Sequence, residues 1–219
     1  MWKYKKIVCL GIAIVASALA TMGIYRGELV NEKVQETQEE LAQSVFRFHV
    51  RANSDTEIDQ NLKLEVRDGI ILYMKKNMDE AGEAKETKEW ARKHLHELEN
   101  EAEEIMIKKG YAYQAKAKVG VEMFPEKTYG DLTFPAGEYE SLSIELGKGE
   151  GQNWWCVLYP NLCFLNSVKA VVPEEGKDML EEELSQDAYN MVTTGTNFKI
   201  KWFFFGDGFT CNQEKECVK

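Results

Sequence analysis

The most pronounced hydrophobic pattern is an uncharged, mostly apolar run over residues 7–24. Lys3, Lys5 and Lys6 precede it, and a basic flank before an apolar run is typical of an export signal. The run is just long enough to span a bilayer as a helix. Small residues over 16–20 suit a signal peptidase, so cleavage and retention both stay open. We predict that residues 1–26 are a signal peptide or a membrane anchor, with membrane contact through residues 7–24 if the segment is uncleaved.

The next two segments differ in their patterns: a polar segment is followed by one in which apolar and basic side chains alternate. Residues 27–44 are rich in Glu and Gln, which predicts a linker or a solvated helix. Residues 45–51 then alternate between apolar and basic side chains, which predicts a half-buried strand with a basic outer face. The apolar side consists of Phe46, Phe48 and Val50, and the basic side of Arg47, His49 and Arg51.

Two long helices are predicted next. Ser54 and Glu57 have the spacing of a capping box, so a helix is expected to begin there. Its apolar residues recur every four positions, which gives one buried stripe. The stripe consists of Ile58, Leu62, Val66, Ile70 and Met74. A second helix is predicted from about residue 84 to residue 109, where Gly110 ends it.

Strands dominate the second half of the pattern. Residues 113–123, 139–146, 154–158 and 197–205 alternate or are apolar over strand-like lengths. An acidic helix is predicted over 174–190. The glycine-rich stretch 147–151 precedes a strand, whereas a phosphate-binding loop precedes a helix, so we interpret it as a hairpin loop.

This order of elements predicts an α+β fold. We expect a single domain in which two long helices pack on one face of a mainly antiparallel sheet, preceded by the N-terminal apolar export or anchor helix. The globular domain is assigned to residues 45–205, and residues 206–219 to a variable tail.

Composition excludes several classes of protein. Hydrophobic residues make up 44% and charged residues 29% of the 219 residues, which argues against disorder. The formal net charge is −10, and residues 1–26 contain basic residues but no acidic one, so the remainder is still more acidic. Such a surface repels phosphate backbones, and nucleic-acid binding is not expected.

Four cysteines lie outside the export segment, as two close pairs. An even number outside the cytosol favours disulfides, and their spacing fits zinc poorly, so we predict no metal and no cofactor. A turn at Pro160 places Cys156 beside Cys163 and predicts a bond between them. A bond between Cys211 and Cys217 is a weaker prediction.

Catalytic and docking interpretations rest on few residues. Cys156 and His49 are a candidate nucleophile and base, although Cys163 is close enough to form a disulfide with Cys156 in an oxidising compartment. Asp59, Lys63 and Arg67 share one helix face at i, i+4 spacing, which suits a surface ion ladder or a docking face. The adjacent residues Trp154 and Trp155 point to opposite sides of a strand, and an exposed one suits a partner hot spot.

Two long stretches resemble a known family. Residues 46–70, FRFHVRANSDTEIDQNLKLEVRDGI, and residues 128–164, TYGDLTFPAGEYESLSIELGKGEGQNWWCVLYPNLCF, resemble the stage II sporulation protein R family of endospore-forming bacteria. The resemblance implies a signalling protein rather than an enzyme. It is expected to be exported across the forespore membrane into the intermembrane space, or anchored to that membrane by its N-terminal helix. There it would activate a membrane-embedded aspartic protease that processes pro-sigma-E in the mother cell.

The alternative is an extracytoplasmic thiol-dependent envelope hydrolase. Under the signalling hypothesis, no residue is catalytic, and polar residues of the first stretch that carries the resemblance become docking candidates for the protease. These candidates are Arg47, His49, Arg51, Asn53, Asp55, Asp59, Lys63 and Arg67, together with Trp154 and Trp155.

Overall fold

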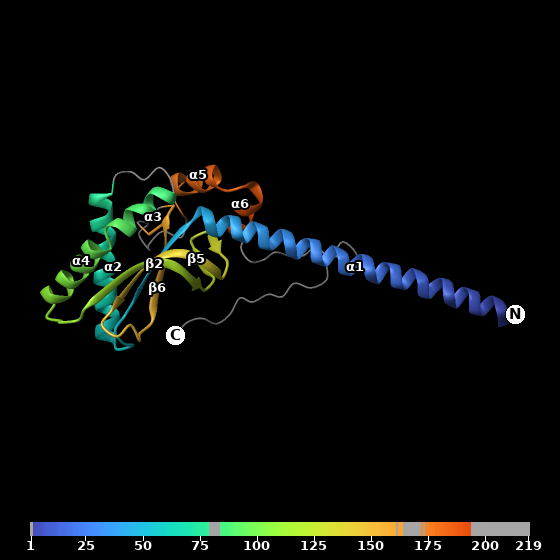
Figure 1. Ribbon diagram of the computed structural model, residues 1–219, viewed down its shortest axis with the longest axis horizontal. Coiled ribbons are helices and arrows are strands. Elements are labelled where there is room, and N and C mark those ends of the chain that lie inside the picture. The colour runs from blue at the N-terminus through green and yellow to red at the C-terminus, as the bar shows by residue number, and fades with distance from the viewer. Residues whose placement is uncertain (1, 79–83, 161, 164–171, 173, 194–219) are drawn as a thin grey trace.

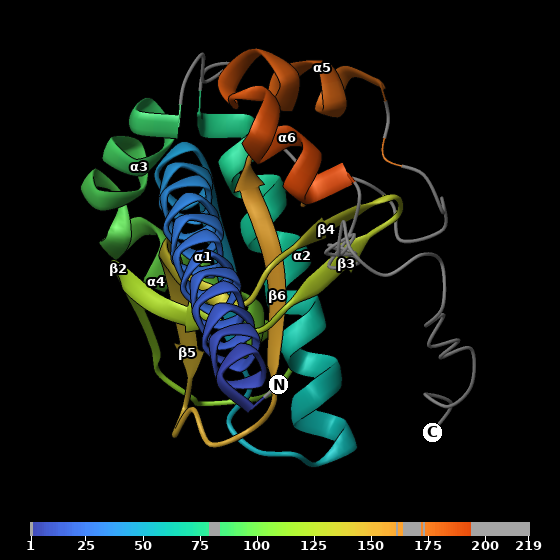
Figure 2. The same ribbon diagram turned by 90° about the vertical axis from the view of Figure 1, so that its right-hand side faces the viewer.

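The computed structural model describes residues 2–78, 84–160, 162–163, 172 and 174–193 (Figure 1). A four-stranded sheet separates two layers, and a long N-terminal helix projects from the domain. One layer contains the three helices that follow the first strand. The other contains the end of the N-terminal helix, a small hairpin and the two helices after the last strand of the sheet, so the sheet is covered on both faces (Figure 2). The predicted α+β class is confirmed.

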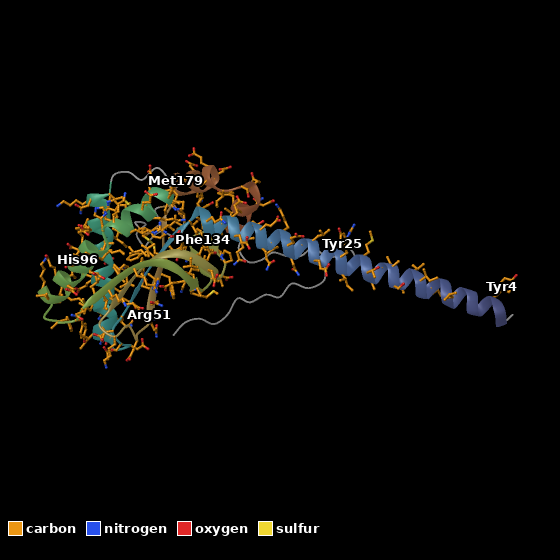
Figure 3. All side chains as sticks on the ribbon, viewed as in Figure 1. Tyr4, Tyr25, Arg51, His96, Phe134 and Met179 are labelled. Carbon is orange, nitrogen blue, oxygen red and sulfur yellow. A yellow bond between two sulfur atoms is a disulfide. The ribbon has the colours of Figure 1, made fainter. Side chains whose placement is uncertain are left out.

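Helix α1 spans Trp2–Ser44 without a break, so the predicted polar linker is the continuation of the apolar helix. Among the described residues, α1 is the helix that is long and apolar enough to cross a membrane. Tyr4 and Tyr25 project from it far from the folded domain (Figure 3). Its last three turns are docked: Leu41 is fully buried, and Gln38 Nε2 donates to Ala136 O at 2.7 Å. A helix suited to a signal or an anchor is therefore continuous with the domain.

The sheet has the strand order β2-β5-β1-β6. Strand β1 is central, parallel to β5 and antiparallel to β6, while β2 and β5 are antiparallel. The sheet is thus mixed, with two of its three strand pairs antiparallel. The strands are β1 (Phe46–Arg51), β2 (Ala115–Phe124), β5 (Gly137–Leu146) and β6 (Asn153–Tyr159).

Helices α2 (Glu57–Asn77), α3 (Ala84–Lys93) and α4 (Leu95–Lys108) cover the first face. The buried stripe of α2 is present except at Ile58, which is 62% exposed. The cap is Thr56, whose hydroxyl accepts from Asp59 N, so the predicted Ser54–Glu57 box is wrong by two residues. The predicted helix 84–109 is broken where the His94 ring stacks on Trp90 and bonds its carbonyl oxygen.

The second face is covered by β3 (Lys127–Tyr129), β4 (Leu132–Phe134), α5 (Glu174–Glu183) and α6 (Gln186–Thr193). The predicted helix 174–190 is therefore two helices, and Ser185 begins the second by accepting from Ala188 N at 3.3 Å. Their core includes Leu41, Phe134 and Val192. This layer buries the face of β1 that the alternation places in solvent.

The glycine-rich loop is not a hairpin loop, because β1 lies between β5 and β6. The loop crosses the end of β1 instead: Gly151 N donates to Ala52 O at 2.9 Å. Gly147 and Gly149 have positive φ, which glycine adopts without steric cost. The predicted strand 197–205, Cys211 and Cys217 lie outside the described residues.

Candidate functional site

Arg47 lies inside the second core rather than on a basic outer face. Its side chain is fully buried, and its guanidinium carbon lies 4.5 Å from the ring centre of Phe124 and 4.9 Å from that of Tyr139. Phe134 is at 5.3 Å and Tyr129 at 6.0 Å. Aromatic faces stabilise a cation, most strongly where water is excluded. The four rings therefore form an aromatic box around the charge.

The polar contacts of Arg47 are few. Nε donates to Cys156 O at 3.1 Å, and Nη2 donates to the Tyr129 hydroxyl at 3.3 Å. Nη1 is buried without a hydrogen-bond partner, and no described carboxylate pairs with the guanidinium. Burial lowers the pKa of Arg47, and the same burial raises the pKa of Tyr139 to about 12. Arginine nevertheless stays charged in proteins, so this is a buried, solitary cation.

His49 is also fully buried, two residues further along the same face. Its Nε2 lies 2.7 Å from Glu122 Oε2, and its Nδ1 lies 3.2 Å from Asn153 Oδ1. The ring centre is 4.9 Å from that of Trp155 and 5.6 Å from that of Phe124. Burial lowers the pKa of His49 although Glu122 and Asn153 act in the opposite direction. Both partner atoms are hydrogen-bond acceptors, so a neutral ring, which carries a single N–H, can donate to only one of them.

Charged residues lie between the buried His49 ring and solvent on the same face of the sheet. Lys118 Nζ lies 2.7 Å from Glu122 Oε1. Burial tends to raise the pKa of Glu122, but the Lys118 hydrogen bond and the neighbouring charges outweigh it and lower that pKa. Arg51 Nε donates to Asn153 Oδ1 at 3.2 Å, and Arg51 Nη1 lies 3.8 Å from Glu145 Oε1. Arg51, the last residue of β1, is the only member of the predicted basic triad that reaches the surface (Figure 3).

Asn53, which is half-buried, and Asp55, which is exposed, both hold the glycine-rich loop. Asn53 Oδ1 accepts from Lys148 N at 3.0 Å, and Asp55 Oδ1 accepts from Gln152 N at 2.7 Å. Asn53 Nδ2 in turn donates to Asp59 Oδ2 at 2.8 Å. These bonds join the start of α2 to the β5–β6 connection.

The predicted surface ion ladder is wrong. Asp59 and Lys63 are each only 5% exposed, and they are not paired with each other. Asp59 also accepts from Ser54 Oγ at 2.6 Å, and despite its burial these hydrogen bonds lower its pKa. Lys63 Nζ donates to Gln152 O at 3.0 Å, and burial lowers its pKa. Neutral partners, rather than ion pairs, therefore satisfy Asp59 and Lys63: two polar side chains donate to Asp59, and Lys63 donates to a backbone carbonyl.

The two tryptophans lie on opposite faces, as the alternation predicts. Trp154 opposes Val50 on the α2 side, where the Arg67 guanidinium carbon lies 4.8 Å from its ring centre. Trp155 opposes His49 on the other side. Both indoles are half-buried. Of the ten candidate residues, Arg47, His49 and Trp155 thus lie on one face of the sheet, and Trp154 and Arg67 lie on the other.

Cys156 and His49 cannot act as a catalytic pair in this fold. Cys156 opposes Phe48 across the β1–β6 ladder, whereas His49 opposes Trp155, so the two side chains lie on opposite faces of the sheet. Cys156 is bonded to Cys163 with a Cα–Cα distance of 5.5 Å. No described group of three His, Cys, Asp or Glu side chains is arranged to hold a metal ion.

Sequence reasoning missed the partners that complete these clusters. Glu122, Phe124 and Asn153 come from the ends of β2 and β6, and only the strand register brings them to β1. One signal was available: Phe124 breaks the alternation of β2, and an apolar residue on the polar face indicates a second core. A cavity of about 430 Å³ lies elsewhere, between the end of α1 and α3. Its lining includes Lys85, Lys88 and Arg92.

These features define an α+β domain with two cores, carried on an N-terminal apolar helix. The family model for stage II sporulation protein R matches residues 42–169. Stage II sporulation protein R of Bacillus subtilis (strain 168) is 33% identical over 179 residues, which cover 81% of this chain and 79% of that protein. No solved structure gives a significant match. The chain belongs to the stage II sporulation protein R family and has a role in sporulation.

Proposed function

We propose that this chain is an exported sporulation signal, not an enzyme, which activates a membrane-embedded aspartic protease and thereby causes processing of pro-sigma-E. The observation that carries the proposal is the identity with stage II sporulation protein R over most of both chains. The proposed site of action is the space between the forespore and mother-cell membranes.

The geometry of α1 supports a membrane-proximal position for the domain. If residues 7–24 lie in a bilayer, the helix continues from residue 25 to the first docked turn near Lys33, which pairs with Asp187 at 2.9 Å. Eight residues of helix at 1.5 Å each place the domain about 12 Å from that bilayer. Helix α1 extends from the domain on the side of the sheet opposite α2 and α4. Helices α2 and α4 would therefore face away from the bilayer (Figures 1 and 2).

The structure gives no support to the thiol hydrolase. That hypothesis needs a free Cys156 thiol next to the His49 ring, whereas Cys156 is bonded to Cys163 and lies on the opposite face. A signalling domain, by contrast, does not require a free thiol, because it acts by binding a partner through its surface.

Deletion of the gene in the sporulating host tests the proposal. Pro-sigma-E is expected to remain unprocessed while the protease is made at its normal level, as measured by immunoblots of both proteins. Reintroduction of the intact gene restores processing. Normal processing in the deletion strain would refute the proposed function.

A further inference from the structure

Strand β2 forms one edge of the sheet, and the two halves of this edge differ. In the first half, Ala115 N donates to a Glu103 carboxylate oxygen at 3.0 Å, and Ala117 N donates to Glu99 Oε1 at 2.9 Å. Both carboxylates come from α4. A free edge invites pairing with another strand, and proteins usually cover or charge it. Helix α4 covers this half of the edge.

In the part of the chain that the structure describes, no such cover lies on the second half of the edge, residues 119–123. Backbone N–H and C=O groups alternate sides along a strand, so those of Val119, Val121 and Met123 point away from β5 in the same direction as those of Ala115 and Ala117. No described residue forms a hydrogen bond with these outward groups. Val121 is 65% exposed and Met123 is 64% exposed. We call residues 119–123 the open β2 edge.

We propose that the open β2 edge binds an extended segment of a partner protein as an additional strand of the sheet. Main-chain hydrogen bonds to Val119, Val121 and Met123 would supply affinity, and apolar side chains of the segment would contact Val121 and Met123. The identity of the partner, the membrane-embedded protease, rests on the proposed function. The open β2 edge would be the surface through which the two proteins bind each other.

The dimensions and contacts of the open β2 edge favour the addition of a single short strand. The open β2 edge is bounded at one end by the carboxylates of α4 and at the other by Pro125, which has no N–H. At its centre, a Cβ added to Gly120 would meet only Lys118 Cε, at 3.8 Å. An added strand therefore has room for a large side chain over Gly120 on the opposite face from Val121.

A second copy of the chain fits the same edge less well. Each chain carries a net charge of −10, so two copies repel one another. Five residues of edge are also short for pairing two whole sheets, because a stable interface buries about 1,200–2,000 Å². A partner with an extended apolar segment avoids both difficulties.

The test uses the full chain in detergent and the purified, detergent-solubilised protease. Val121→Pro removes one outward N–H and leaves the ladder with β5 intact, because Val121 does not bond β5. Val121→Lys keeps the backbone but charges the edge. Leu72→Lys is the matched control, since Leu72 is 67% exposed on α2. We expect both Val121 variants to lose at least about tenfold in affinity and the control to bind like the wild type.

Amide hydrogen exchange gives a readout that depends on the backbone alone. In the isolated chain, the amides of Val119, Val121 and Met123 are expected to exchange much faster than those of Gly120 and Glu122, which pair with β5. The protease is expected to slow the three fast amides. Circular dichroism melting curves of all variants check that folding is retained.

Each contrary outcome is distinct. Wild-type affinity in both Val121 variants would overturn the inference and leave the proposed function standing. Protection of the three amides in the isolated monomer would show that the chain itself occupies the edge, and protection that appears only with dimers would assign it to a second copy; either result overturns the inference. A wild-type chain that does not bind the protease would refute the proposed function itself, and with it the partner.

Discussion

The guanidinium carbon of Arg47 lies 4.5 Å from the ring centre of Phe124, inside the second core. The side chain fills space among aromatic rings and carries a charge without a described carboxylate partner. These two properties make different predictions for substitution. Volume and charge can therefore be separated with two variants at one position.

Arg47→Ala is expected to destabilise the protein by about 3–5 kcal/mol, because it leaves a cavity among four rings. Arg47→Met is expected to cost less than about 1.5 kcal/mol, since it fills the space and removes a desolvated charge. Urea unfolding measures both free energies. If Met were as costly as Ala, the charge and not the volume of Arg47 would stabilise the box.

His49 predicts a pH dependence of stability. Its pKa in the folded state is lowered by burial, so below its unfolded pKa of about 6.5 the unfolded chain binds a proton that the folded chain does not. Stability is therefore expected to fall as the pH is reduced from 7.5 towards 5.5. The groups facing the ring are Glu122, Asn153, Arg51, Trp155 and Phe124.

The matched variant is His49→Gln, which retains hydrogen-bonding groups but does not titrate. Melting curves between pH 5.5 and 7.5 are expected to show a smaller decrease for this variant than for the wild type. Glu122 reinforces the wild-type trend at lower pH, because its folded pKa is also lowered and its stabilising effect is lost on acidification. Parallel curves for the two proteins would show that His49 does not titrate differently on folding.

The disulfide between Cys156 and Cys163 closes a short loop with a sequence separation of 7 residues. In the chain-entropy model, a loop of this size contributes about 2–3 kcal/mol. Replacing both cysteines with Ser is expected to lower the melting temperature by about 5–10 °C under oxidising conditions and to leave signalling partly intact. Complete loss of signalling without a change in melting temperature would identify a functional thiol pair.

Asn53 is predicted to fix the glycine-rich loop through its bond from Lys148 N. Asn53→Ala leaves Lys148 N and Asp59 without that partner, at a cost of about 1–3 kcal/mol. Amide exchange at Lys148 is expected to accelerate, as measured by NMR. Glu150→Gln, an exposed change in the same loop, serves as the control. Equal exchange in Asn53→Ala and wild type would place the stability of the loop elsewhere.

Periodicity predicts the parts of this fold that depend on one core. The α2 stripe from Leu62 to Met74 and the alternation of β5 at Leu142 and Ile144 both have one apolar side, and the structure buries both. The second core was not predicted, because it combines polar strand positions with elements distant in sequence. Phe124 and Leu41 reach the face of Arg47 only through the packing of β2 and α1.

The same limit applies to the candidate site: local spacing predicts which face of a strand a side chain lies on, but not what covers that face. Local spacing correctly separates Trp154 from Trp155 but places Arg47 and His49 in solvent. Alternation defines the two faces of a strand without showing how many of them are covered. Asp59 and Lys63 have ion-pair spacing, yet each is closer to a partner in the Asn53–Asp55 turn or the β5–β6 connection. Contacts with the preceding turn determine the position of Asp59, and a contact with a distant segment determines that of Lys63.

Reconstitution in bacteria that do not sporulate tests whether this chain activates the protease. Three cultures each produce the protease and pro-sigma-E: one also produces the complete chain, one produces the chain without residues 2–26, and one produces neither. We expect cleavage of pro-sigma-E on immunoblots with the complete chain, and no cleavage with the form that lacks residues 2–26. Equal cleavage in all three cultures, or none in any of them while the protease is present, would contradict this expectation.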